Sequence, residues 1–342
     1  MTKRLTEVAQ KVSVSEATVS RVLNGKPGVS EATRAAVLTA LDVLGYERPV
    51  KLRGERARLV GLVLPELQNP IFPALAEVVG GGLAQLGFTP VLCTRAAGSS
   101  LSEAEYVEML LDQHVSGMVF AGGSFAELDS PHDHYRLLLE RSLPVVLVNA
   151  AVDDLPFPRV CTDDVVAIEQ ALSHLVSLGH REIGLVLGPE AHMPSRLKRA
   201  AFESLGRSLG IEIDPDRIEA AAFSLEAGHA AATRLVQKGV TAIICASDPL
   251  ALGAIRAIRR LGHRVPEDIS VVGFDDSAFM MCTDPPLTTV RQPIEAMGRA
   301  AVSILVGRIE GTVSAPEELL FEPELVVRGS TAPAPVGPRS GR

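Results

Sequence analysis

Short apolar runs rich in β-branched residues alternate with helical stretches over residues 59 to 310, and this alternation constrains the fold more than any other feature. Buried parallel strands joined by crossover helices produce this pattern, so the sequence predicts doubly wound α/β sheets. The predicted strands are 59–64, 91–93, 117–121, 145–148, 183–187, 242–246 and 269–274, and the predicted helices are 71–86, 102–113, 133–141, 164–178, 195–209, 225–238, 249–261 and 293–310.

The chain length indicates more than one such sheet. With 342 residues there is room for two or three domains. A second strand and helix series begins near Val160, which favours two similar units over one very wide sheet. The longest apolar runs are too short to span a membrane, and the N-terminus lacks the apolar core of a signal peptide, so we expect a cytoplasmic protein.

The first 45 residues carry a different pattern, that of a compact three-helix head with a tight turn between its first two helices. Ser15 and Ser30 stand where N-caps of the second and third helices belong. The expected core positions are Leu5, Val8, Ala9 and Val12 in the first helix, Val19, Val22 and Leu23 in the second, and Ala32, Ala36, Val37, Ala40, Leu41 and Leu44 in the third.

The outer face of the second helix is typical of a recognition helix in the major groove of DNA. It carries short or polar side chains and one arginine, namely Glu16, Ala17, Thr18, Ser20, Arg21 and Asn24. Residues 1–58 hold 11 Lys and Arg against 6 Asp and Glu, a net charge of +5, whereas the remainder holds 22 against 35, a net charge of −13. A basic head on an acidic body suits a nucleic-acid binder. The alternative is a small helical bundle whose outer face is merely solvated.

The motifs VSEATVSRVLNG at 14–25, VSEATR at 29–34 and LGY at 44–46 closely resemble the LacI/GalR family of bacterial transcription factors. The resemblance implies a helix-turn-helix DNA-binding domain over 1–46, a hinge or linker over 47–58 and a periplasmic-binding-protein-like body over 59–331. In that body one subdomain comprises 60–160 and 292–320, and the other comprises 161–291 and 321–331. The remaining residues, 332–342, have no apolar pattern and are predicted to be disordered.

The linker departs from the family pattern. The resemblance implies a hinge helix whose leucine, here Leu52, wedges into the minor groove. However, the family's Asn after Pro49 is absent and the linker is about three residues short, so Leu52 could equally be an exposed residue of a flexible segment. In the head and the linker together, the residues expected to contact DNA are Thr6, Ser15, Glu16, Ala17, Thr18, Ser20, Arg21, Asn24, Tyr46, Leu52 and Arg53.

A ligand is expected where the predicted strands end, because open α/β sheets bind ligands at the carboxyl ends of their strands. The polar and aromatic residues there suit sugar hydroxyls better than a phosphate, which calls for arginines and a glycine-rich loop. For Asp248 and Asp276 we favour capping over ligand contact. The residues that follow the strands are Gln68, Asn69, Phe72, Asn149, Asp163, Asp164, Ser247, Asp248, Asp275 and Asp276.

The resemblance assigns roles to some of these positions through GFDDS at 273–277, LTTVRQP at 287–293, ASDPLALGA at 246–254 and HLVSLGH at 174–180. The family's effector-binding arginine corresponds to Lys198, with Arg196 as a possible substitute, and Ser247 replaces a commoner Asn. The strand ends and the resemblance together predict the effector-binding residues Asn69, Phe72, Asn149, Asp163, Arg196, Lys198, Phe223, Ser247, Asp275 and Gln292, of which Asn69 and Asp163 rest on the strand ends alone.

No catalytic or metal-binding constellation stands out. The four cysteines lack paired spacing and are expected to be reduced core residues, and His132 and His134 are expected in a solvated loop. Ser195 lacks a G-x-S-x-G context, and no G-x-G-x-x-G follows the first strand. We therefore expect a protein that is not an enzyme and has neither cofactor nor metal.

The sequence as a whole predicts a dimeric repressor that binds a palindromic double-stranded DNA operator and responds to a small sugar. The runs VLNGKPGV at 22–29, LGYERPV at 44–50, NPIFPAL at 69–75 and CTDPPLTTV at 282–290 resemble the maltose- and maltodextrin-responsive repressors of actinobacteria, which implies an α-glucoside effector. The alternatives are a sugar-binding protein without a regulatory role and a regulator of a different sugar or a non-sugar ligand. The protein would be cytoplasmic and associated with the bacterial nucleoid.

Overall fold

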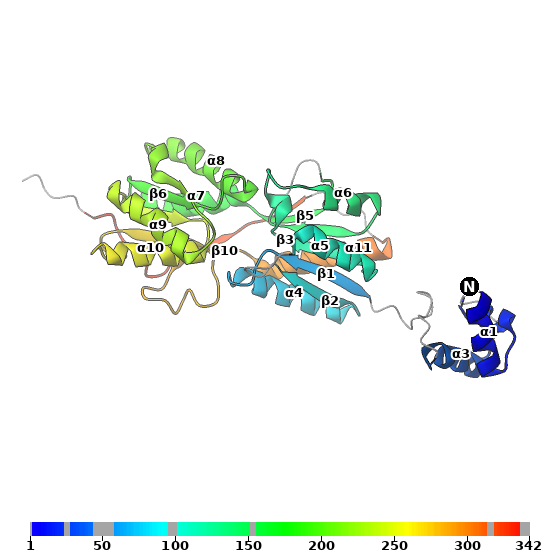
Figure 1. Cartoon of the computed structure of the whole chain (residues 1–342). Helices are drawn as coiled ribbons and strands as arrows, with labels where there is room; N and C mark the ends of the chain where they lie inside the picture. Colours follow the sequence, from blue (N-terminus) through cyan, green and yellow to red (C-terminus); the bar gives the residue numbers. More distant parts are fainter. Residues whose placement is uncertain are drawn as a thin grey trace, which may run out of the picture. The chain divides into compact units, whose positions relative to one another are not determined.

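The computed structural model describes residues 2–23, 28–43, 58–94, 101–150, 155–312 and 318–335. The chain divides into two compact units, one of Met1–Leu59 with Gly87–Thr89 and the other of Val60–Leu86 with Pro90–Arg342 (Figure 1). We call them the head and the body. Four of the predicted DNA-contacting residues, Asn24, Tyr46, Leu52 and Arg53, lie outside the described residues, as does most of the linker.

The head consists of α1 (Thr2–Val12), α2 (Glu16–Leu23) and α3 (Glu31–Val43). Its core contains the buried residues Val8, Ala9, Val19, Val22, Val37 and Ala40. The prediction for the third helix was wrong at Ala32 and Ala36, which are exposed. At 100° per residue, positions spaced by four residues drift around the helix. Ala36 and then Ala32 therefore lie progressively farther from the buried face that carries Val37 and Ala40.

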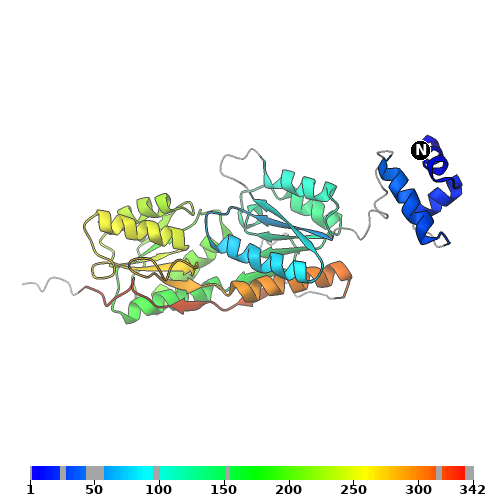
Figure 2. The same ribbon diagram turned by 90° about the horizontal axis from the view of Figure 1, so that it is seen from below.

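The body contains the two doubly wound sheets that the alternating pattern predicts. The first sheet has the strand order β11-β5-β4-β3-β1-β2. Helices α4 and α11 pack together on one side of it, as Figure 2 shows. Its elements are β1 (Leu59–Leu64), α4 (Ile71–Gln85), β2 (Thr89–Thr94), α5 (Glu103–Asp112), β3 (Gly117–Ala121), η1 (Ser124–Ala126), α6 (Asp133–Glu140), β4 (Val145–Val148), β5 (Arg159–Thr162), α11 (Ile294–Glu310) and β11 (Glu318–Phe321).

The second sheet has the order β12-β10-β9-β8-β6-β7, with β12 antiparallel to β10 and the other pairs parallel. Helices α7 and α8 pack against each other, as do α9 and α10. Its elements are α7 (Asp164–Ser177), β6 (Ile183–Leu187), α8 (Met193–Ser208), η2 (Pro215–Arg217), β7 (Ile218–Ala220), α9 (Leu225–Gln237), β8 (Ala242–Cys245), α10 (Asp248–Arg260), β9 (Ser270–Asp275), β10 (Thr288–Arg291) and β12 (Glu324–Val326).

The chain passes between the two sheets three times: after β5, after β10 and after β11. The first passage follows Thr162, two residues beyond the expected boundary at 160, because β5 pairs with β11 through its whole length, up to Thr162. Carboxyl ends of parallel strands from both sheets lie close together where the chain crosses. Among the described residues no helix is both long and apolar enough to span a membrane.

The cysteines differ from their expected placement at one position. Cys161 and Cys245 are buried and Cys93 is half-buried, but Cys282 is exposed. Cys282 lies in the loop between β9 and β10, where the neighbouring Phe279 and Met281 are also exposed. The apolar composition of this loop therefore marks a surface and not a strand of the core.

Candidate functional site

The second helix of the head presents the predicted surface side chains outward. Ser15 caps α2 by accepting a hydrogen bond from the Thr18 backbone N–H at 3.1 Å. Glu16, Ala17 and Arg21 are exposed, and Thr18 and Ser20 are half-buried. Thr6 lies in α1, but its side chain is outside the described set. The buried residues Val19 and Val22 define the opposite face of α2, which packs in the core of the head.

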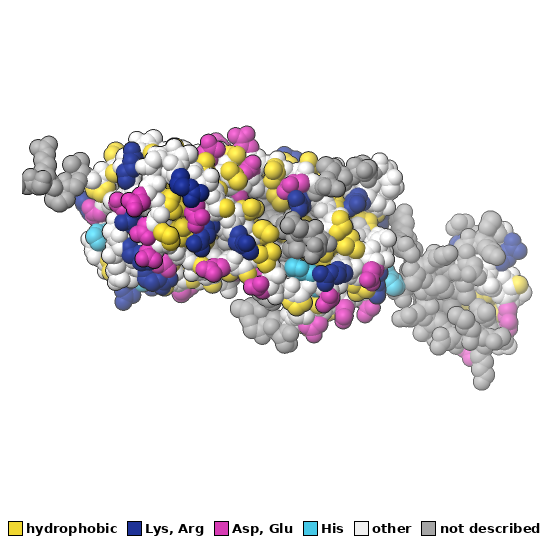
Figure 3. Space-filling model, turned by 90° about the horizontal axis from the view of Figure 1, so that it is seen from above, with side chains coloured by type: hydrophobic (Ala, Val, Ile, Leu, Met, Phe, Trp, Pro, Cys, Tyr) yellow, Lys and Arg dark blue, Asp and Glu magenta, His cyan; other side chains and the backbone are white. Residues whose placement is uncertain are grey.

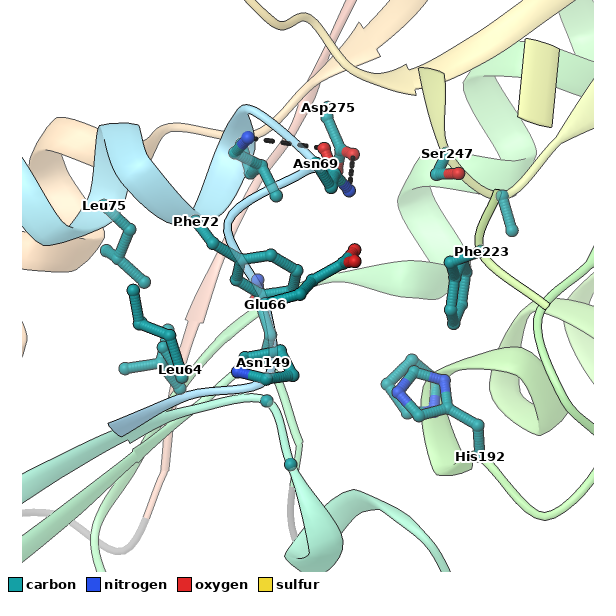
Figure 4. Close-up of a pocket in the computed structure, with 18 of the residues that line it drawn as sticks. Leu64, Glu66, Asn69, Phe72, Leu75, Asn149, His192, Phe223, Ser247 and Asp275 are labelled. Carbon is teal, nitrogen blue, oxygen red and sulfur yellow. Dashed lines mark hydrogen bonds between the residues drawn. The ribbon is translucent and has the colours of Figure 1, made fainter. Parts of the chain in front are cut away.

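A cavity of about 430 Å³ lies in the body between the two sheets. Its volume falls in the range of roughly 300–1,000 Å³ that is typical of small-molecule sites. Residues from the ends of β1, β3 and β4 line one side, and residues that follow β6, β8 and β9 line the other. The cavity therefore occupies the position that the strand ends predict, with walls from both halves of the body (Figure 4).

A chain of amide and carboxylate hydrogen bonds connects the two sheets beside this cavity. Asp275, at the end of β9, accepts from Asn69 Nδ2 at 3.1 Å and from Gln292 Nε2 at 2.6 Å. Gln292 Oε1 in turn accepts from Asn149 Nδ2 at 2.7 Å and from Thr162 Oγ1 at 2.8 Å. These residues all line the cavity, so several hydrogen-bonding groups converge on one place.

The carboxyl group of Asp275 is held in an unusual environment. It is 5% exposed, and its residue has φ of +114°, in the left-handed region that non-glycine residues rarely adopt. Burial, and then the neighbouring carboxylate of Asp248, raise the pKa of Asp275 to about 8. A buried carboxyl group with a strongly raised pKa in a cleft is a frequent mark of a functional site.

Two phenylalanine rings stand on opposite sides of the cavity (Figure 4). Phe72 lies in the first turn of α4, and Phe223 follows β7. Gly188 allows the second ring its position, because a Cβ atom there would lie 2.1 Å from Phe223 Cζ. The His192 ring packs edge-on against Phe223 with centroids 5.3 Å apart. Apolar rings opposite a set of amides suit the mixed character of a sugar, which has apolar C–H faces and polar hydroxyl edges.

Lys198 is buried against a partner of opposite charge. Its Nζ forms an ion pair with Asp164, and it also lies 4.1 Å from the centroid of the Phe274 ring. Burial raises the pKa of Asp164, and the charge of Lys198 opposes that effect. Arg196, the alternative basic residue, is exposed and does not line the cavity. Of the two, Lys198 is the basic residue that faces the ligand space.

The structure brings most of the predicted effector-binding residues together. Asp163 instead caps α7, because its Oδ1 accepts from the backbone N–H groups of Val165 and Val166 at 3.0 and 3.1 Å, and the adjacent Asp164 lines the cavity. The predicted effector-binding residues that do line the cavity are Asn69, Phe72, Asn149, Lys198, Phe223, Ser247, Asp275 and Gln292.

The capping roles expected for Asp248 and Asp276 were wrong. The N-cap of α10 is Ser247, whereas Asp248 accepts from the Ser277 hydroxyl at 2.7 Å and the Thr289 hydroxyl at 2.7 Å. Asp276 forms ion pairs with two arginines, at 2.7 Å with Arg291 and 2.6 Å with Arg328. Both carboxylates therefore bond to side chains in or next to β9 and β10. The sequence did not predict these roles because most of the partners are distant in the chain.

Several cavity residues were not predicted from the sequence. They come from loops and helix starts of both halves, and include Glu66, Glu103, Tyr106, Glu127, Thr162 and His192. His134 was expected in a solvated loop, but its Nε2 lies 3.0 Å from Glu103 Oε1 and its side chain is 9% exposed. Only Thr162 carried a usable signal, since it precedes the predicted Asp163 at a strand end.

Comparisons with known proteins agree with this architecture. A family model for bacterial regulatory proteins of the lacI family matches residues 4–48, and a model for a periplasmic binding protein-like domain matches residues 172–331. The HTH-type transcriptional regulator MalR of Streptomyces coelicolor is 50% identical over 339 residues, which is 98% of each chain.

Two solved structures are similar along almost the whole chain. One is the complex of the transcriptional regulator CelR with cellobiose, at 33% identity and a TM-score of 0.72, covering 95% of this chain and 99% of that one. The other is the lac repressor dimer bound to operator and the anti-inducer ONPF, at 28% identity and a TM-score of 0.69, covering 95% and 98%. With a helix-turn-helix head joined to a periplasmic-binding-protein-like body, the chain belongs to the LacI family of bacterial regulatory proteins.

Proposed function

We propose that the protein is a transcriptional repressor whose affinity for operator DNA is controlled by a sugar bound in the cavity of the body. The observation that carries this proposal is the cavity wall, which combines two facing phenylalanine rings with amides, hydroxyls and carboxylates from both sheets. In the same chain, α2 exposes Arg21 and short polar residues as a recognition helix does. The protein would act in the bacterial cytoplasm, at the nucleoid.

The polar groups of the cavity match the hydrogen-bonding capacity of sugar hydroxyls. A hydroxyl donates one hydrogen bond and accepts others, so it can donate to Asp275 and accept from the amides of Asn149 and Gln292. The Phe223 ring offers an apolar surface to the C–H face of a pyranose ring. Asn149, Phe223, Ser247, Asp275 and Gln292 are therefore the residues that we propose for the first contacts with the effector, with Phe72, Asn69 and Lys198 beside them.

We assign the effector to the α-glucosides, such as maltose or a maltodextrin. Support comes from the MalR relative at 50% identity and from the motifs shared with maltose-responsive repressors. The CelR structure contains cellobiose, so a similar body accommodates a glucose disaccharide of the other anomeric linkage. Glucose disaccharides of α and β linkage are thus the informative pair of test ligands.

A homodimer on a palindromic operator is the arrangement we propose for DNA recognition. A single head reads too few base pairs to select one genomic site, and two-fold symmetry of the protein then requires two-fold symmetry of the DNA. The similar lac repressor structure is a dimer bound to operator. On this chain, the exposed Phe279 (69%) and Met281 (62%) supply apolar surface that a partner subunit could cover.

Effector control would operate through the relative position of the two halves of the body. A sugar that contacts both sheets stabilises one arrangement over the other by the difference in its affinity for the two, and operator affinity changes by the linked amount. The Asn69–Asp275 hydrogen bond joins the halves at the cavity, and Gln292, at the crossing after β10, bonds to both Asp275 and Asn149, so a bound hydroxyl would compete with these bonds directly.

The test is selection of binding sites from a random duplex library with the full-length protein, followed by titration of the selected DNA at fixed salt with a panel of sugars. We expect an inverted-repeat site, and a change in DNA affinity with maltose or maltotriose but not with ribose. Failure to enrich any sequence would refute DNA recognition. A selected site whose affinity no sugar alters would refute sugar control.

A further inference from the structure

The charged side chains around the cavity are almost all acidic. Four carboxylates line it, those of Glu66, Glu103, Glu127 and Asp164, together with the carboxyl group of Asp275, whose raised pKa keeps it protonated near neutral pH; a single lysine and no arginine stand against them among the described lining residues. This excess bears on ligand chemistry, because sugars in cells occur both as neutral molecules and as phosphate esters. Resting on the proposed sugar response, we propose that the cavity rejects anionic sugars, so that the effector is an unphosphorylated sugar, and that Glu66 and Glu127 enforce this selectivity.

The one lysine is not available to an anion. Lys198 Nζ is already in an ion pair with Asp164 and lies over the Phe274 ring, and the two charged side chains are 6% and 11% exposed. A phosphate that took Lys198 as its partner would leave Asp164 as a buried carboxylate without its cation, which is strongly unfavourable. Lys198 and Asp164 together therefore present no net positive charge to a ligand.

The one cavity histidine supplies no positive charge either. His192 is neutral near physiological pH, since burial and then the nearby charge of Lys198 lower its pKa to about 4. Its Nδ1 lies 3.2 Å from Ser195 Oγ, and its ring packs on Phe223. As a neutral ring it can hydrogen-bond a hydroxyl, but it cannot balance a phosphate.

Helix N-termini are the other common anion sites in α/β proteins, and side chains already occupy those of α4, α7 and α10 beside the cavity. Asn69 Oδ1 accepts from the first backbone N–H of α4 at 3.3 Å, Asp163 caps α7, and Ser247 caps α10. The start of α8 has no side-chain cap, but Pro194 removes one N–H from its first turn, and the Phe223 and His192 rings lie beside it.

The remaining carboxylates face the ligand space without a Lys or Arg partner among the described ion pairs. Glu66 extends past the Phe72 ring towards the open centre in Figure 4, and burial raises the pKa of its carboxyl group. Glu127 Oε2 accepts only from Ser130 Oγ, at 3.1 Å. A neutral sugar can donate hydroxyl protons to both, whereas the ionised phosphate group of an ester offers only acceptors and is repelled by the carboxylates.

The size of the effect follows from the number of charges. At a separation of about 10 Å and an effective dielectric constant near 40, each carboxylate weakens binding of a doubly charged phosphate by roughly tenfold. Glu66 and Glu127 together should then account for about a hundredfold preference for the neutral sugar. A regulator with this selectivity senses a sugar before a phosphoryl-transfer reaction modifies it.

The experiment is calorimetric titration of the full-length protein with maltose and with maltose 6′-phosphate, with the melting temperature in inorganic phosphate measured against chloride at equal ionic strength. We expect binding of maltose, at least a hundredfold weaker binding of the ester, and a smaller stabilisation by phosphate in the wild type than in the Glu66→Gln, Glu127→Gln variant. In a Glu66→Gln, Glu127→Gln double variant the ratio of the two affinities, for maltose over maltose 6′-phosphate, should fall at least tenfold. The control variant Glu108→Gln, which removes one negative charge from an exposed position on α5, should leave this affinity ratio unchanged.

The outcomes separate this inference from the proposed function. The inference is overturned, while sugar control stands, if the affinity for the ester lies within tenfold of that for maltose. It is also overturned if the ratio of the two affinities is the same in the double variant and the wild type. If neither sugar binds, the α-glucoside assignment is wrong, and the phosphate measurement still tests the inference: a shift of the melting temperature in phosphate that is the same in the Glu66→Gln, Glu127→Gln variant and in the wild type overturns anion rejection.

Discussion

At the scale of single residues, the DNA contact that matters most is Arg21. Its side chain is exposed on α2, between the buried Val19 and Val22 that fix the helix in the head. An arginine that holds a guanine by two hydrogen bonds contributes about 1–3 kcal/mol of discrimination. We therefore expect Arg21→Ala to weaken binding to selected DNA by roughly 10- to 100-fold and to relax its sequence preference.

The measurement is a mobility-shift titration with selected and scrambled duplexes at the same salt concentration. Arg136→Ala, which removes an exposed arginine from the body, is the matched control and should bind as the wild type does. An Arg21→Ala protein with undiminished affinity for the selected site would exclude Arg21 from base recognition.

Asp275 makes a residue-scale prediction about pH. Its folded pKa of about 8 lies above the ordinary value near 4, so the folded state holds this proton more tightly than the unfolded chain. The stability that the proton contributes is complete below about pH 4 and is lost as the pH rises towards 8. Asp275→Asn mimics the protonated side chain, so its stability relative to the wild type should increase across this range and level off above it.

Denaturant unfolding of both proteins between pH 4 and 9 measures that difference directly. Titrating groups that do not interact with Asp275 are common to the two proteins and cancel in the comparison, whereas the neighbouring Asp248 contributes to the difference together with Asp275. A difference that is constant with pH would mean that the carboxyl group titrates at its ordinary value, so that the hydrogen bonds from Asn69 and Gln292 fully offset the effect of burial on its pKa.

At the scale of elements, the repeated VSEAT segment begins two helices in the same way. Ser15 accepts from Thr18 N–H at 3.1 Å and Ser30 accepts from Thr33 N–H at 3.2 Å. Each cap should contribute about 1 kcal/mol, so Ser15→Ala and Ser30→Ala should destabilise the head by similar amounts in thermal unfolding.

The same pair of variants separates capping from DNA contact. Ser15 begins the proposed recognition helix and Ser30 does not, so only Ser15→Ala should lose DNA affinity beyond what the shared loss of stability explains. Equal losses in a mobility-shift titration would assign Ser15 a purely structural role.

The elements that the sequence predicted well are those whose burial shows in their composition. The strands at 59–64, 117–121, 145–148 and 183–187 coincide with β1, β3, β4 and β6, and the eight predicted helices of the body are all present. β10 was missed because its sequence is TTVR, yet Thr288 and Thr289 are fully buried. Their hydroxyls are satisfied by Thr331 and Asp248, partners that only the folded chain brings close.

The candidate site divides in the same way. Residues such as Asn149 and Asp275 could be predicted because they directly follow strands, and the sheet delivers strand ends to one place. Glu66, Glu127 and His192 could not, because an acidic or histidine side chain in a loop reads as solvated. Their position at the cavity depends on how the two halves of the body meet, which no local pattern encodes.

At the scale of the whole molecule, charge is divided between the parts that the proposed function separates. The head and linker carry +5 and the remainder carries −13. On the face of the body in Figure 3, Lys and Arg side chains lie beside Asp and Glu, in keeping with the surface ion pairs Arg199–Glu203 and Arg234–Glu219. Repulsion between an acidic body and phosphates should leave DNA contact to the head.

The central claim is that ligand occupancy of the cavity in the body controls the affinity of the head for DNA. The variant Phe223→Ala tests this claim most directly. The measurement is the affinity of wild type and variant for the selected site at fixed salt, with and without saturating maltose. We predict a change of roughly tenfold or more in the wild type, within the usual range of allosteric coupling. In Phe223→Ala the change should disappear, while sugar-free affinity stays within about twofold of the wild type. A variant that responds to maltose as the wild type does, or a wild type that does not respond, would contradict the account.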